Sequence, residues 1–171
     1  MTAYIALLRA VNVGGTGKLP MAELVAMCER AGFTGARTYI ASGNVVFASD
    51  LPEAAVKAAL ERALHEYAGK PVGVMVRDAA EMAAIRDANP FPGAPGNRIT
   101  AIFLDHAPPA DAADHATGAN GEEIATGIRE IYVRYTDHGM GKSRLKIPAA
   151  RTGTARNMNT VATLAKLAAA L

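Results

Sequence analysis

The sequence predicts an α+β protein: a ferredoxin-like split β-α-β unit, followed by a second, smaller α+β subdomain and a C-terminal helix. Three observations predict this class. Patterns of strand, helix, strand, strand, helix and strand follow one another within residues 1–77, which is the order of a ferredoxin-like unit. Part of that order recurs over residues 78–171, and the last pattern is helical. We therefore expect two subdomains, 1–77 and 78–171, that pack as one unit.

Each element of the first half follows from a local signal. Apolar or β-prone runs bounded by turn-forming residues predict strands at residues 4–9, 38–41, 45–48 and 72–77. Apolar side chains at helical spacing predict two helices, which begin at Pro20 and Pro52 and end at Gly32 and Gly69. The turn-forming residues 42–44 join the second and third strands into a hairpin.

Residues 78–171 show weaker helix and strand patterns of the same kinds. Helices are expected over residues 78–87, 110–115 and 154–170, and strands over residues 99–104, 123–126 and 130–135. The last two strands resemble a hairpin. The segment 136–152 has no regular pattern, and the final helix carries Val161, Leu164 and Leu167 along one side.

The composition of the 171 residues excludes several classes of protein. Half of the residues are hydrophobic, so the chain is neither disordered nor fibrous. The single cysteine, Cys28, excludes an internal disulfide framework and suits a reducing compartment. We find no basic leader and no apolar run of the roughly 18 residues that a bilayer requires. We therefore expect a soluble, cytoplasmic protein with no membrane partner, and the oligomeric state stays open.

The net charge of +2 hides an asymmetry along the chain. Residues 1–126 hold 10 Lys and Arg against 14 Asp and Glu, whereas residues 127–171 hold 8 against 2. The basic residues beyond Asp137 are Lys142, Arg144, Lys146, Arg151, Arg156 and Lys166. They either neutralise the acidic body or present a positive surface to a phosphate or carboxylate ligand. Nucleic acid is the less favoured partner, because no aromatic residue follows Tyr135.

The glycine-rich loop at residues 13–19 invites a nucleotide-binding interpretation, but its spacing does not match. A P-loop would need Gly where Asn12 stands and Ser or Thr where Leu19 stands, and Pro20 breaks the dinucleotide-binding pattern. The loop is either a tight strand-to-helix connection or a non-standard anion cradle. Asn12 and Asn44 each lie where a predicted strand meets a turn. They are either ordinary turn residues or neighbours at one edge of the sheet.

Other chemistry-bearing residues give weaker signals. Asp111 and His115 are four residues apart, with Asp105, His106 and Asp114 close by. This spacing permits a metal site, but the segment is typical of a solvated loop, so we predict no metal. Cys28 lies on an apolar helix stripe and is expected to be a buried hydrophobic residue. We find no catalytic triad and no general base among the motif residues, so neither a reaction nor a cofactor is predicted.

Three segments, at residues 4–15, 37–47 and 154–161, together resemble the bacterial family catalogued as domain of unknown function 1697. The resemblance implies ferredoxin-like α+β subdomains and implies no activity. The positions that match the family's motifs are Arg9, Asn12, Gly14, Gly15, Ser42, Gly43, Asn44, Arg156, Asn157, Asn159 and Thr160. The chain departs from the family at Ala10, where Gly is common, and at Met158, where Trp is more frequent. The second departure weakens the case for an aromatic platform there.

Our leading hypothesis from the sequence is a site for a small anionic ligand, such as a nucleotide or a phosphorylated metabolite. In it Asn12, Asn44, Arg156 and Asn157 converge with the glycine loop, whose amides complete the shell. The further candidate ligand-binding residues are Arg9, Gly14, Gly15, Ser42 and Asn159. The alternative is a nucleic-acid or protein binding module that uses the basic C-terminal segment. A catalyst acting on a phosphorylated compound and a set of purely structural turns and caps are two further interpretations.

Overall fold

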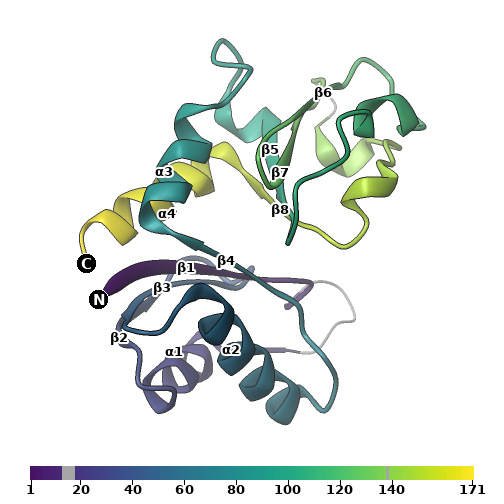
Figure 1. The fold of residues 1–171 in the computed structure, drawn as a ribbon. Coiled ribbons are helices and arrows are strands. Elements are labelled where there is room, and N and C mark those ends of the chain that lie inside the picture. Colours follow the sequence, from purple (N-terminus) through teal and green to yellow (C-terminus); the bar gives the residue numbers. More distant parts are fainter. Residues whose placement is uncertain (13–17, 138) are drawn as a thin grey trace. The chain divides into compact units, whose positions relative to one another are not determined.

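The fold was analysed in a computed structural model that describes residues 1–12, 18–137 and 139–171. The chain divides into two compact units (Figure 1). Unit 1 comprises Met1–Ala83 and Thr163–Leu171, and unit 2 comprises Ala84–Ala162. Helix α3 (Ala79–Asp87) and helix α4 (Met158–Ala169) each contribute residues to both units. None of the helices in the described part of the chain is long and apolar enough to cross a membrane.

Unit 1 has the topology that the sequence predicts. Its elements are β1 (Thr2–Leu8), α1 (Met21–Arg30), β2 (Thr34–Thr38), β3 (Asn44–Ser49), α2 (Glu53–Ala68) and β4 (Val74–Asp78). The strands pair antiparallel in the order β2-β3-β1-β4, which is the ferredoxin-like arrangement with the first and third strands at the centre. Helices α1 and α2 lie on the same face of this sheet (Figure 1).

The core of unit 1 follows from the alternation of side chains along its strands. Tyr4, Ala6 and Leu8 of β1 point to one face and join a buried cluster with Leu24 of α1 and Leu60 of α2. Three of the four helix boundaries that the sequence predicts, at Pro20, Pro52 and Gly69, are confirmed, and α1 ends at Arg30 with its C-cap at Ala31, one residue before the predicted Gly32. Pro20 stands at the N-cap of α1, and Gly69 ends α2 in the left-handed conformation with φ +72°.

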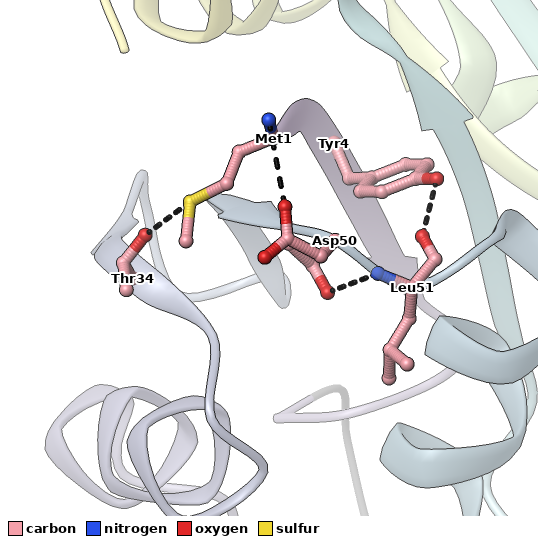
Figure 2. A network of polar contacts seen from close by, with 6 residues as sticks. Met1, Tyr4, Thr34, Asp50 and Leu51 are labelled. Carbon is pink, nitrogen blue, oxygen red and sulfur yellow. Dashed lines mark hydrogen bonds and ion pairs between the residues drawn. The ribbon is translucent and has the colours of Figure 1, made fainter.

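Polar contacts fasten the first strand to the segment that precedes α2 (Figure 2). The Tyr4 hydroxyl donates to the Leu51 carbonyl at 2.8 Å, and the Met1 amino group lies 3.5 Å from Asp50 Oδ1. Thr34 Oγ1 of β2 lies 3.4 Å from Met1 Sδ. The N-terminal end of β1 therefore contacts both β2 and the segment between β3 and α2.

Unit 2 contains a second sheet with the same strand order. Its strands are β5 (Ile99–Phe103), β6 (Glu123–Thr126), β7 (Glu130–Arg134) and β8 (Thr154–Asn157), ordered β6-β7-β5-β8 and antiparallel throughout. The first and third strands of this unit, β5 and β7, again lie at the centre of the sheet. The connections differ, however. The β5–β6 connection contains the 3₁₀ turn η2 (Ala112–His115), and the described part of the β7–β8 connection contains only η3 (Met140–Lys142) and η4 (Pro148–Ala150). A further turn, η1 (Gly96–Arg98), precedes β5.

The sequence misplaces one strand of unit 1 and the beginning of the last helix. The first hairpin strand lies at Thr34–Thr38 instead of residues 38–41, because Ile40 has a left-handed φ of +51° that ends the extended backbone. The predicted last helix begins too early, because Thr154–Asn157 form β8 and pair with β5, for example Ala101 with Arg156. The first error concerns a hairpin strand that pairs with the next strand, β3, and the second concerns a short strand whose partner, β5, is distant in sequence.

Candidate functional site

The edge of unit 1 where β1 ends brings two predicted site residues close together. Leu7 is paired with Asn44 at the end of β1 and the beginning of β3, and the Asn12 side-chain Nδ2 donates to the Ala41 carbonyl at 2.9 Å. The loop after β1 and the β2–β3 hairpin are therefore hydrogen-bonded to each other. Strand direction and register, which the sequence left open, thus place Asn12 and Asn44 at the same edge.

Both asparagine side chains bind the protein itself. Asn12 Nδ2 also donates to the Leu19 carbonyl at 2.9 Å, and its Oδ1 accepts from the Leu19 amide at 2.7 Å. Asn44 is fully buried, and its Nδ2 donates to the Tyr39 carbonyl at 2.9 Å and to Ser42 Oγ at 3.0 Å. These contacts match the interpretation of each asparagine as a residue that fixes a turn. Their role at this edge is to position backbone.

The same edge holds a backbone conformation that is unusual for residues other than glycine. Ala10, Asn12 and Ile40 have φ values of +55°, +54° and +51°. Asparagine tolerates this region, whereas a β-branched isoleucine rarely adopts it. Arg9, which precedes them, is exposed, and its amide donates to the Gly73 carbonyl at 2.9 Å. The edge is thus ordered by several hydrogen bonds at some cost in strain.

The third motif belongs to β8 and to the beginning of α4. Asn157 Oδ1 accepts from the Thr160 amide at 2.9 Å, which makes Asn157 a helix cap. Thr154, where the sequence predicts the beginning of the last helix, lies in β8 instead. Burial lowers the pKa of the Arg156 guanidinium to about 10, so Arg156 stays charged at neutral pH. Asn159 is exposed, and its Oδ1 lies where a side chain at Gly96 would stand.

Some of the sequence-predicted residues are not brought into these clusters. Gly14 and Gly15 lie outside the described residues. Asn12 and Asn44 belong to unit 1, whereas Arg156, Asn157 and Asn159 belong to unit 2. In the exposed segment near η2, His115 Nε2 lies 3.0 Å from Asp111 Oδ2. The described residues contain no group of three or more His, Cys, Asp and Glu side chains placed to hold a metal ion.

Unit 2 contains a pocket of about 500 Å³ that sequence reasoning did not identify. Its volume lies within the range of small-molecule sites. The lining residues come from β5, the end of β7 and both irregular connections: Ile102, Thr117, Tyr135, Leu145, Lys146, Ile147, Pro148, Ala150 and Arg151. The pocket lies on the sheet face where a ferredoxin-like unit carries crossover helices, and 3₁₀ turns cover less of that face than α-helices do.

Two irregular segments are clamped together at the wall of this pocket. The Thr117 amide donates to the Lys146 carbonyl at 2.9 Å, and the Lys146 amide donates to the Thr117 carbonyl at 2.8 Å. Gly118 follows with φ +73°, and a Cβ there would lie 2.1 Å from the Arg144 carbonyl oxygen. Only glycine fits at this close approach. The wall of the pocket is therefore a defined structure, although the segment has no regular pattern.

The pocket combines an apolar floor with a basic rim. Ile102, Leu145 and Ile147 belong to or pack against the hydrophobic cluster of this sheet face, while Lys146 and Arg151 are exposed at the lining. None of the described lining residues is acidic. Burial raises the pKa of the Tyr135 hydroxyl, and the charge of Glu122 raises it further, so this phenol is a proton donor at neutral pH. The arrangement suits a ligand that has an apolar body and an anionic group.

Only part of this site could be recognised from the sequence. Lys146 and Arg151 were identified as members of the basic segment, but the apolar residues near them occur at no regular spacing. The signal that could have found the pocket is the lack of a long helical pattern in either connection of the second sheet: only the short pattern at residues 110–115 occurs in the first connection, and residues 136–152 have no regular pattern. Such connections leave part of the sheet face uncovered.

Comparisons with known proteins agree with the fold and the motifs. Residues 1–132 match the family described as "Protein of unknown function (DUF1697)". The chain belongs to this family. A solved structure, that of a conserved bacterial protein from Streptococcus pneumoniae, is similar to this DUF1697 chain with a TM-score of 0.79. That protein is 21% identical in sequence, and the alignment covers 98% of each chain. None of the curated proteins matches this DUF1697 chain.

These comparisons confirm the resemblance that the motifs suggested and the α+β fold. At 21% identity, the structural likeness concerns the fold alone. Neither the family nor the solved structure assigns a ligand or a reaction to the DUF1697 chain. A function must therefore be argued from its own residues.

Proposed function

We propose that this protein binds a small molecule with an apolar body and an anionic group in the pocket of unit 2. The observation that carries the proposal is the lining of that pocket. Lys146 and Arg151 accompany an apolar floor, and none of the described lining residues supplies a negative charge. Ammonium and guanidinium groups both form charge-assisted hydrogen bonds to phosphate, sulfonate or carboxylate. Sites of this kind bury most of an apolar ligand and orient it with few polar groups.

This proposal keeps the small anionic ligand that the sequence predicted and changes its location. That Arg9, Ser42, Arg156 and Asn159 contact a ligand stays a prediction. For Asn12, Asn44 and Asn157, the observed hydrogen bonds to backbone favour a positioning role. No reaction is part of the proposal.

The test uses two fluorescent probes with the same aromatic body. 1-Anilinonaphthalene-8-sulfonate carries an anionic group, and N-phenyl-1-naphthylamine lacks it. We expect the wild type to bind the sulfonate probe more tightly than the neutral probe. Lys146→Gln and Arg151→Gln should each weaken sulfonate binding about fivefold, which corresponds to about 1 kcal/mol for a solvent-exposed charged contact. Binding of the neutral probe should not change.

The control variant is Lys166→Gln, which removes the same charge from an exposed position of α4 outside the pocket lining. Equal affinity for both probes in the wild type would contradict the proposal. A further measurement distinguishes this proposal from the alternative function, nucleic-acid binding by the basic segment. If a short oligonucleotide binds only at low salt and Lys166→Gln weakens it as much as Lys146→Gln does, the basic segment is a general electrostatic surface.

A further inference from the structure

A second cavity lies in unit 1, where residues 10–11 after β1, residues 18–19 before α1, and the end of α2 with its connection to β4 come together. Its volume is about 240 Å³. Val11, Leu19 and Leu64 are buried residues at its floor, and the exposed side chains around it are Lys18, Tyr67 and Lys70. All of its described lining residues belong to unit 1, and none of them lines the pocket of unit 2.

The wall of this cavity is fixed by Asn12. Its side chain bonds both the amide and the carbonyl of Leu19, at 2.7 and 2.9 Å. Leu19 therefore has little freedom to move relative to Val11, and Lys18 is attached directly to this anchored residue. Ala10, also in the lining, has a left-handed φ of +55°. A wall held in a strained conformation by several hydrogen bonds is typical of a preorganised binding site.

The charges around the cavity favour an anion. Ala68 at the end of α2 also lines the cavity, and a helix C-terminus carries a partial negative charge of about half an elementary charge. The ammonium groups of Lys18 and Lys70 contribute two full positive charges, which outweigh it. None of the described lining residues is acidic. The described lining residues therefore carry a net positive charge, although unit 1 holds many of the acidic residues of the chain.

Two lysines and a small volume together define the class of ligand. A phosphomonoester carries a charge of about −1.5 to −2 at neutral pH, which matches two ammonium groups better than a monovalent carboxylate does. The cavity is too small for a large ligand, because drug-sized molecules occupy roughly 300 Å³ or more. Tyr67 is 47% exposed, so its ring offers an apolar surface beside the lysines. We infer that this cavity binds a small phosphomonoester of the size of a sugar phosphate, with its phosphate group between Lys18 and Lys70.

The experiment measures binding of ribose 5-phosphate by calorimetry and by amide chemical shifts in the full-length protein. Ribose is the control ligand because it lacks the phosphate group. We expect ribose 5-phosphate to bind and ribose not to bind, with shifts at the Leu19 and Lys70 amides. Lys18→Gln and Lys70→Gln should each weaken binding at least fivefold. Tyr67→Leu should weaken ribose 5-phosphate more than inorganic phosphate.

Two control variants keep this test independent of the proposed function. Lys166→Gln and Arg151→Gln remove one positive charge elsewhere, and both should bind ribose 5-phosphate as the wild type does. Absence of binding in the wild type, or equal binding by Lys18→Gln and the wild type, would overturn the inference. Loss of binding in Arg151→Gln alone would place the phosphate in the pocket of unit 2 instead. Because all the variants change exposed side chains, unchanged circular dichroism spectra are expected throughout.

Discussion

Gly43 is the residue on which the close approach of the two loops at the edge of unit 1 depends. It has a φ of +91°, and a Cβ at this position would lie 2.6 Å from Val11 Cγ2 and 2.9 Å from Leu8 Cβ. Its carbonyl also accepts a hydrogen bond from the Leu8 amide at 2.8 Å. Substitution by alanine therefore combines an unfavourable backbone conformation with a steric overlap.

The two contributions can be estimated separately. A left-handed conformation costs a residue with a Cβ about 1–2 kcal/mol, and overpacking a filled site costs about 1–3 kcal/mol. We expect Gly43→Ala to lower the free energy of unfolding by about 2–5 kcal/mol. The matched control is Gly32→Ala in the same unit, where φ is +84° and no heavy atom lies within 4 Å of the added Cβ. That variant should cost only the first contribution.

The assay is urea unfolding followed by circular dichroism, because the chain has no tryptophan for fluorescence. Both glycines belong to unit 1, so the same transition is compared. The difference between the two variants measures the overlap with Leu8 and Val11. If Gly43→Ala and Gly32→Ala cost the same, the two loops do not pack as closely as described.

Three further predictions concern other parts of the chain. Gly118→Ala should displace the Arg144 carbonyl, disturb the adjacent Thr117–Lys146 pairing at the wall of the unit 2 pocket and weaken sulfonate-probe binding, as a fluorescence titration will show; unchanged affinity would mean that this pairing does not shape the site. Asn157→Ala should cost about 1 kcal/mol of stability through loss of the α4 cap, while Asn157→Asp retains it, as thermal denaturation will show. Burial, assisted by the charge of Glu29, raises the pKa of Cys28 to about 12. The native thiol should therefore react slowly with a disulfide reagent at pH 8, and the stability of the fold should fall as the pH rises above about 8.5, where the unfolded thiol ionises first.

Much of the fold could be predicted because its signals are local. Pro20, Pro52 and Gly69 mark helix ends through their own backbone preferences, and these boundaries are confirmed. The two short strands at Thr34–Thr38 and Thr154–Asn157 could not be placed, because their extended backbone depends on pairing with other strands: the first with the adjacent β3 and the second with the distant β5. Ile40 illustrates the difficulty: its β propensity predicts a strand, but the loop holds it at positive φ.

The candidate site was less predictable than the fold. The motif asparagines are conspicuous in the sequence, yet Asn12 and Asn44 direct their amides to backbone carbonyls. Lys146 and Arg151 are visible as charges, but the apolar floor beside them forms only when irregular connections cover one face of the second sheet. A pocket that depends on long-range packing leaves no periodic pattern in the sequence.

The most direct test of ligand binding in unit 2 is to locate the sulfonate probe by amide chemical shifts in the wild-type protein. We expect the largest shifts at Thr117, Lys146 and Arg151, and we expect Lys146→Gln to reduce them at the same probe concentration. Shifts confined to unit 1, or spread evenly over the basic residues of the C-terminal segment, would contradict it.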